Sequence, residues 1–385
     1  MLGYLLARSG VEVMVLEKHA DFFRDFRGDT IHPSTLEVLQ ELGLLDEFLK
    51  LPHNEGQSVG AQIGSFKFTA ADFSHLPTRC KFIAFTPQWD FLNFLAQQGE
   101  KYPTFHLKLE HSVTGLLRDR ERVIGVFAET PDGPVEITAD LVIGADGRSS
   151  LVREQSGLAV TDIGAPFDVL WMRVSRHPDD PLTSLGNFQT GRGIIMINRQ
   201  DYWQCGFIIA KGSLEKLKEE GIIAFQQNIA EIAPFLNERV RELNSWEKIK
   251  LLTVQVNHLH RWYSPGLLCI GDAAHAMSPV GGVGVNLAVQ DAVAAANLLT
   301  DALLSRSVTE EILSRVEKRR LWPALMTQRF QVFIQEKFLL PVLRGEKEIS
   351  VPLVVRLLSA FPVLQRIPAR LLGLGFRPEH VTHRE

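Results

Sequence analysis

The chain has 385 residues, of which 45% are hydrophobic and 22% are charged, as in an ordinary globular protein. Its 23 Phe and 6 Trp residues provide too much core material for a disordered chain, and its net charge of −4 leaves no basic field for nucleic acid. The three cysteines, Cys80, Cys205 and Cys269, share no CxxC spacing. This spacing argues against a disulfide framework or a structural zinc site and favours a reducing, cytoplasmic location.

The N-terminal pattern is that of the second half of a βαβ unit. Residues 1–9 have a helical apolar face that stops at Gly10, and residues 11–16 form an apolar strand that we expect to be buried, ending at Glu17. In a dinucleotide-binding fold, an acidic residue here binds a ribose and follows a glycine-rich phosphate loop by about 20 residues. We therefore expect Glu17 to bind a ribose and the glycine-rich loop to lie upstream of Met1. A solvated strand end is the simpler alternative for Glu17.

The next stretch mixes helical and strand patterns. We expect helices at 36–49, opened by Pro33, and from Phe91 to about Gln98, and strands at 60–70, 79–86, 105–117, 121–130 and 134–139, the last two joined by a turn at 131–133.

A short strand at 141–143, which we expect to be buried, runs into Gly144-Ala-Asp-Gly147, with Arg153 soon after. Gly144 and Gly147 let the backbone approach a ligand closely, and Asp146 offers a carboxylate to a diol. An ordinary Asp-Gly turn is the alternative.

A second buried strand, 267–270, ends at Gly271-Asp272, and a glycine loop at 281–284 then opens a long helix over 286–304. The backbone N–H groups at such a helix start stabilise negative charge. A packing turn is the alternative. We expect His275 to be a core residue rather than a metal ligand, because no second His or Cys lies nearby at metal spacing, and we expect no metal site.

The remaining segments complete the pattern. We expect strands across 165–210 and at 250–261, helices at 213–230 and 235–243, and helices broken by prolines over 308–379. Parallel-sheet pieces interleaved with an antiparallel region predict an α/β nucleotide-binding domain with a β-rich domain inserted in two stretches. The run 338–374 is apolar enough to touch a membrane, but we expect core packing instead and no membrane contact.

At the segments Gly144–Arg153 and Gly271–Asp272 the sequence resembles the class A FAD-dependent monooxygenases, the flavoprotein aromatic hydroxylases related to p-hydroxybenzoate hydroxylase. The resemblance runs from Met1 to about residue 380. The sequence lacks the family's first strand and its Gly-x-Gly-x-x-Gly motif, so we expect a gene product truncated at its N-terminus.

The resemblance implies a Rossmann-like FAD-binding domain at 1–60, 85–160 and 255–325, a mainly antiparallel substrate domain at 61–84 and 161–254, and a C-terminal helical segment at 326–385. It also implies cofactor contacts by Glu17, Arg27 at the diphosphate, Gln88 at the ribityl region, Asp146, Gly147, Arg153, Gly271, Asp272, and the flavin-side turn formed by Pro279, Gly281, Gly282, Val283, Gly284, Val285 and Asn286. Pro279 is the one candidate for a catalytic position, since no acid or base can be named.

The implied reaction uses FAD, NAD(P)H and O2, and a flavin C4a-hydroperoxide hydroxylates an aromatic or polyketide-like small molecule. Candidates for the substrate wall come from the β-rich domain, with core packing as the alternative for each: Trp171, Met172, Met196, Trp203 and Phe207. An FAD-dependent dehydrogenase or reductase, or a non-catalytic remnant, stays open. A flavin halogenase is disfavoured, because its Trp-x-Trp-x-Ile-Pro signature is absent.

Overall fold

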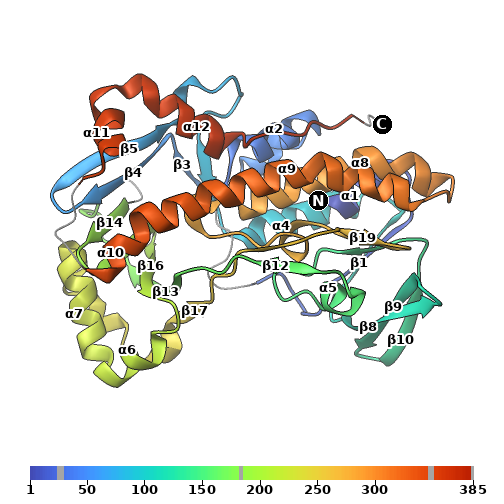
Figure 1. The fold of residues 1–385 in the computed structure, drawn as a ribbon, viewed down its shortest axis with the longest axis horizontal. Helices are drawn as coiled ribbons and strands as arrows, with labels where there is room; N and C mark the ends of the chain where they lie inside the picture. The colour runs from blue at the N-terminus through green and yellow to red at the C-terminus, as the bar shows by residue number, and fades with distance from the viewer. Residues whose placement is uncertain (24–29, 182–184, 346–350, 383–385) are drawn as a thin grey trace.

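The structure, a computed structural model, describes residues 1–23, 30–181, 185–345 and 351–382. It is a mixed α/β fold with C-terminal helices, as the sequence predicts (Figure 1).

Two small parallel sheets form the base of the predicted cofactor domain. One pairs β1 (Val13–Leu16) with β7 (Phe105–Lys108), and the other pairs β11 (Val142–Gly144) with β20 (Leu267–Cys269), which also pairs with β19 (Tyr263–Ser264). Among the described residues, no backbone pairing joins β1 to β11. The helices of this region are α1 (Leu2–Arg8), α2 (Pro33–Glu41), α3 (Leu45–Phe48), α4 (Gln88–Gly99) and α5 (Leu151–Ser156).

The three predicted buried strands differ in burial. In β11, Val142 and Ile143 are only half-buried, so the expectation for 141–143 is not met. Strand β20 is fully buried, as expected. The expectation for 11–16 is wrong, because Met14 is 45% exposed and Val11 alone is buried. The side chain of Val15 faces α1 near Gly3, whereas the opposite face of β1, with Met14, is open to solvent.

The inserted region is dominated by one seven-stranded sheet. Its order is β17 (Lys250–Leu252), β13 (Phe167–Ser175), β16 (Tyr202–Ala210), β15 (Arg192–Asn198), β14 (Leu185–Gln189), β4 (Ser58–Ile63) and β5 (Phe66–Asp72). All pairs are antiparallel except β14 with β4, so the predicted mainly antiparallel sheet is present. Helices α6 (Leu214–Glu220) and α7 (Ile222–Ile232) lie beside this sheet in Figure 1.

The other strands form smaller sheets. One consists of β8 (Ser112–Asp119), β9 (Arg122–Thr130) and β10 (Gly133–Thr138). Another pairs β12 (Val160–Asp162) with β18 (Asn257–Leu259), and a further one consists of β2 (Thr30–Ile31), β6 (Ile83–Phe85) and β3 (Asn54–Gly56).

Several predicted elements are interrupted. The helix expected at 36–49 splits into α2 and α3 because Gly43 adopts a left-handed φ of 71°. The strand expected at 60–70 is a hairpin of β4 and β5, and that at 105–117 divides into β7 and β8. The helix expected at 235–243 consists of two short 3-10 turns.

Two long helices, α8 (Gly284–Leu304) and α9 (Glu310–Ile334), cross the molecule side by side (Figure 1). The segment Val280–Leu304 is long and apolar enough to span a membrane, but 67% of its most apolar window is buried inside the fold. It is therefore a core helix here.

The chain ends in a π-helical turn η7 (Gln335–Leu339), α10 (Leu340–Arg344), α11 (Leu353–Ala360) and α12 (Arg366–Gly373). The expectation of core packing throughout this run is wrong for α11, none of whose residues is buried. The helix lies on the edge strand β5, which covers one side of it and leaves the other to solvent.

Candidate cofactor site

The two aspartate–glycine motifs meet at the ends of neighbouring parallel strands. Gly144 of β11 is in register with Cys269 of β20, and the Ile270 N–H donates to the Gly144 carbonyl at 3.0 Å. Beyond the strands, Arg148 Nη2 lies 3.4 Å from Asp272 Oδ2. The two motifs therefore lie close together, because the carboxyl ends of parallel strands lie at the same sheet edge.

Arg148 is the residue that sequence reasoning missed at this junction. Its side chain is 33% exposed, yet its Nη1 atom is buried and has no hydrogen-bond partner in the described part of the chain. A buried unpaired guanidinium N–H is costly, so this atom fits an oxygen of a bound ligand. Its position next to Gly147 inside the motif was the signal available in the sequence.

Helix α5 uses the other polar groups of the first motif. Ser150 caps the helix by accepting from the Arg153 N–H, and it also donates to Asp146. Asp146 accepts a second hydrogen bond from the Val152 N–H at 3.2 Å. These bonds orient Asp146 toward the helix start, although the residue is exposed and its carboxylate keeps free lone pairs.

The predicted cofactor role of Arg153 is not supported. Its Nη2 donates to the Arg148 carbonyl at 2.6 Å, and its Nη1 donates to Asn257 Oδ1 at 3.1 Å and to the Ala273 carbonyl at 3.5 Å. The guanidinium fork is thus occupied by protein acceptors and fastens the two motifs together.

The glycine turn before α8 is packed closely against other parts of the chain. Gly281 and Gly282 have φ values of 79° and 64°, and a Cβ on Gly282 would lie 2.4 Å from Thr30 Oγ1. Helix α8 starts at Gly284 with no side-chain cap, and Gly284 and Val285 are half-buried. The start of a 21-residue helix therefore presents uncapped N–H groups where the sequence places the flavin ring.

The side-chain amide of Asn286, a predicted cofactor contact, is fully used within the protein. Oδ1 accepts from the His32 N–H and from Thr35 Oγ1, both at 2.8 Å. Nδ2 donates to the carbonyls of Thr30 at 3.1 Å and Gly282 at 3.3 Å. Asn286 instead fastens the glycine turn to β2 and to the start of α2.

His32 lies in the same cluster. It is fully buried, and its Nδ1–H donates to the Leu372 carbonyl at 2.7 Å. Burial lowers the pKa of His32 to about 4, against the smaller opposing effect of that carbonyl, so the ring is neutral at pH 7.

A buried ion network holds the Gly271–Asp272 turn from behind. Asp291 Oδ2 accepts from the Gly271 N–H at 3.0 Å and lies 2.5 Å from His275 Nε2, while Asp291 Oδ1 accepts from Arg320 Nε at 2.9 Å. Burial alone would raise the pKa of Asp291, but His275 and Arg320 outweigh it and lower that pKa. His275 is 1% exposed, as expected for a core histidine.

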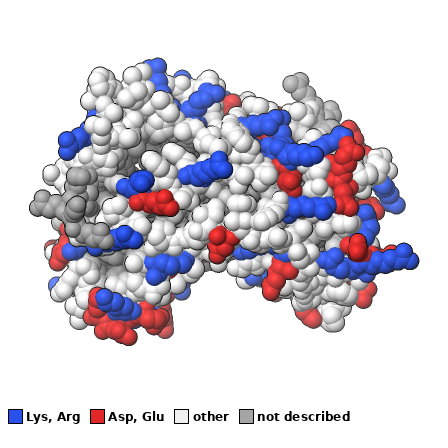
Figure 2. Space-filling model, viewed as in Figure 1, with Lys and Arg blue, Asp and Glu red and all other residues white. Residues whose placement is uncertain are grey.

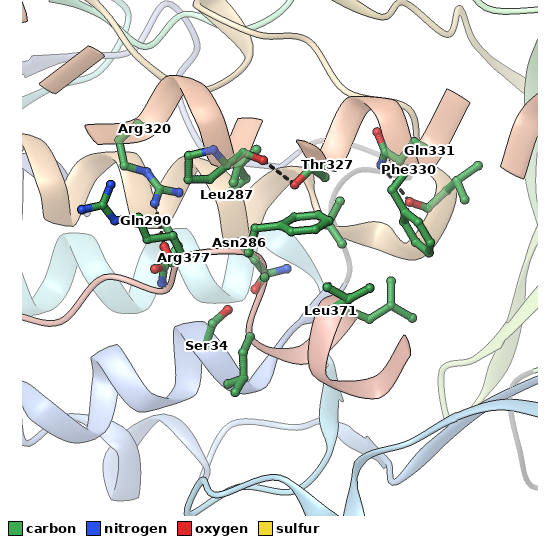
Figure 3. Close-up of a pocket in the computed structure, with 17 residues that line it drawn as sticks. Ser34, Asn286, Leu287, Gln290, Arg320, Thr327, Phe330, Gln331, Leu371 and Arg377 are labelled. Carbon is green, nitrogen blue, oxygen red and sulfur yellow. Dashed lines mark hydrogen bonds between the residues drawn. The ribbon is translucent and has the colours of Figure 1, made fainter. Parts of the chain in front are cut away.

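Arg320 extends this network to the C-terminus. Its Nη1 donates to Glu379 Oε1 at 3.2 Å and to the Arg377 carbonyl at 2.9 Å. Arg319 pairs with the same carboxylate at 2.8 Å, and the Glu379 N–H donates to Gln290. Figure 3 shows Arg320, Gln290 and Arg377 beside a cavity of about 40 Å³ between α8, α9 and α12, on the side of α8 that bears Asn286.

Two other predicted cofactor residues, Glu17 and Gln88, belong to other elements of the fold. Glu17 follows β1 and accepts from the His19 N–H at 3.0 Å. Gln88 is the first residue of α4 and is half-buried. Arg27 lies outside the described residues.

The predicted substrate wall divides between the two faces of the large sheet. Met172, Met196, Trp203 and Phe207 are at most 5% exposed and form a core cluster with Phe225, Ile229 and Ile232 of α7. This packing against α7 favours the alternative of core packing for these four residues.

Trp171 alone among the five lies on the opposite face. It packs in the cluster that contains Val280 of the glycine turn, together with Ile195, Ile208 and Phe338. Its indole Nε1–H is buried without a hydrogen-bond partner among the described residues. Strand alternation predicted apolar side chains on both faces of the large sheet. The position of α7 decides which face is core and which face is left for the candidate site.

Comparison with known proteins agrees with this geometry. The FAD binding domain family matches residues 1–329. The chain belongs to this family. It is 29% identical over 375 residues to the 6-methylpretetramide 4-monooxygenase of Streptomyces rimosus, covering 96% of this chain and 88% of the relative.

Solved structures of the same fold include pqsL of Pseudomonas aeruginosa, a probable FAD-dependent monooxygenase, with a TM-score of 0.75, 19% identity, and coverage of 90% of this chain and 93% of that one. The OxyS anhydrotetracycline hydroxylase of Streptomyces rimosus gives a TM-score of 0.74, 23% identity, and coverage of 98% and 74%. The chain is an FAD-dependent monooxygenase. The family and its relatives favour this function over a dehydrogenase or a non-catalytic remnant.

Proposed function

We propose that the enzyme uses NAD(P)H and O2 to hydroxylate a polycyclic, polyketide-like aromatic molecule, bound between the glycine turn and the Trp171 face of the large sheet. The observation that carries this is the unpaired indole N–H of Trp171 in the same cluster as Val280. A buried donor on an apolar wall suits a flat ring system that bears oxygen substituents. The relative that acts on 6-methylpretetramide supports the substrate class.

The junction of the two motifs would hold the FAD. Asp272 would accept hydrogen bonds from ligand hydroxyl groups, and the unpaired Nη1 of Arg148 would donate to a ligand oxygen. Gly147 and Gly271, both with positive φ, let the backbone come close to the ligand. Glu17, Arg27 and Gln88 remain proposed contacts at the ribose, the diphosphate and the ribityl chain.

When bound, FAD supplies the electron-transfer chemistry that activates O2. The chain contributes electrostatics and shape. The uncapped start of α8 carries about half a positive charge and would stabilise negative charge on the ring beside Pro279 and Gly281–Val285. The apolar Val280 and Trp171 would exclude water from the reacting atoms.

The domain organisation that the resemblance implies stays part of the proposal. Residues 1–60, 85–160 and 255–325 would form the cofactor domain, 61–84 and 161–254 the substrate domain, and 326–385 the helical segment. A cytoplasmic location suits the three cysteines, which are free and buried; burial raises the pKa of Cys205 and Cys269 to about 12.

The test is flavin retention combined with product analysis. Asp272→Ala is expected to weaken FAD binding by about tenfold or more, since hydrogen bonds to charged groups contribute about 1.5–3 kcal/mol. Asp301→Ala, at an exposed position near the end of α8, is the matched control. Unchanged FAD affinity in Asp272→Ala would refute the assigned site.

The reaction class is tested with ¹⁸O₂ and a polycyclic phenol. One labelled oxygen atom in the product supports hydroxylation. Substrate oxidation without label would indicate a dehydrogenase instead.

A further inference from the structure

The C-terminal helices expose an unusual amount of apolar surface. Six large hydrophobic side chains between residues 353 and 367 are exposed, and we call them the C-terminal apolar face: Leu353 (72%), Val354 (63%), Leu357 (41%), Phe361 (55%), Val363 (59%) and Ile367 (62%). They make up about a third of the exposed large hydrophobic residues in the described part of the chain. Scattered exposed residues of this kind are normal, but a contiguous group marks an interaction site.

The group is contiguous because of helical spacing. Leu353 and Leu357 lie four residues apart on α11, which places them on one side of the helix, and Phe361 is the residue that ends it. Val363 lies in the 3-10 turn that follows, and Ile367 lies at the start of α12. Both helices pack on β5, and α11 lies at one corner of the molecule (Figure 1). The six apolar side chains are on the exposed part of this segment.

The charged residues between positions 351 and 378 are all arginines. Of these, Arg356, Arg366 and Arg370 are exposed. On the strand beneath, Lys67 adds a positive charge, and Asp72 places a carboxylate near Arg366. Figure 2 shows this corner as mostly uncharged surface with basic side chains.

We propose that the C-terminal apolar face docks the enzyme on an anionic lipid surface. Arginine stems lie along apolar surface while their heads reach phosphate groups, so apolar and basic residues on one face suit the lipid interface. A second copy of the chain fits less well. A two-fold contact would bring the same arginines of both copies together without acidic partners in this segment. The proposal does not depend on the proposed substrate.

The test is co-sedimentation of the full chain with vesicles of phosphatidylcholine containing 30% phosphatidylglycerol, compared with pure phosphatidylcholine. We expect binding to the anionic vesicles, weakened by 0.5 M NaCl, and little binding to the neutral ones. Leu357→Glu is expected to reduce the binding at least tenfold. Ile223→Glu on α7, at a position 67% exposed, is the matched control and should bind like the wild type.

A charge variant separates the two contributions. Arg356→Gln combined with Arg370→Gln is expected to lower binding to anionic vesicles while circular dichroism and FAD content stay unchanged. The proposal is overturned if the wild type does not bind anionic vesicles, or if Leu357→Glu and Ile223→Glu bind equally. A dimer on gel filtration that Leu357→Glu dissociates, without vesicle binding, would also overturn it and assign the face to a second copy.

Discussion

Replacing Arg320 with methionine should destabilise the protein and loosen its cofactor turn. The guanidinium is 1% exposed and bridges Asp291 and Glu379, which are themselves buried. Removing one partner of a buried ion pair costs about 3–5 kcal/mol, because an uncompensated charge is left behind. Each carboxylate keeps a second partner, His275 or Arg319, so we expect about 3 kcal/mol, at the lower end of that range.

The assay is urea unfolding of matched variants, followed by FAD titration. Arg319→Met is the control, because it removes a pair with the same Glu379 at 2.8 Å but from a side chain that is 40% exposed. Such a pair contributes only about 0–1 kcal/mol. Arg320→Met should also weaken FAD binding, since Asp291 holds the Gly271 N–H. Equal loss of stability in the two variants would refute the reasoning.

Three further predictions concern a buried histidine, a glycine turn and the two faces of the large sheet. His32 has a folded-state pKa of about 4 instead of 6.5, so it contributes about 3 kcal/mol to the free energy of unfolding above pH 6.5, and this contribution is lost as the pH falls toward 4. His32→Asn should therefore make the free energy of unfolding less dependent on pH over this range, and an unchanged pH profile would contradict the prediction. Gly282→Ala should weaken FAD binding and lower the melting temperature more than Gly64→Ala, since both have positive φ but Gly64 alone has open space for a Cβ. Trp171→Phe should raise KM for a phenolic substrate with little loss of stability, whereas Met172→Ala should cost about 2–5 kcal/mol of stability and leave KM unchanged; the opposite pattern would exchange the two faces.

The sequence determined the local chemistry of the site. Strand β20 is a continuous apolar run that ends at Gly271-Asp272, and the glycines that follow predict the turn and the start of α8. These features depend on residues adjacent in the chain, since burial on both faces, left-handed φ and helix starts leave local patterns. The pairing of the two motifs also followed, because parallel strands end at the same sheet edge.

Tertiary structure alone decided which partner each side chain meets. Trp171 and Met172 are neighbours on an apolar strand, and only the position of α7 makes one a core residue and leaves the other beside Val280. Asn286 looked available for a ligand until His32 and Thr35 were brought to it from more than 250 residues away. The apolar pattern of α11 likewise predicted burial, but none of its residues is buried. Apolar side chains favour leaving water, and whether they are buried depends on another part of the protein packing over them.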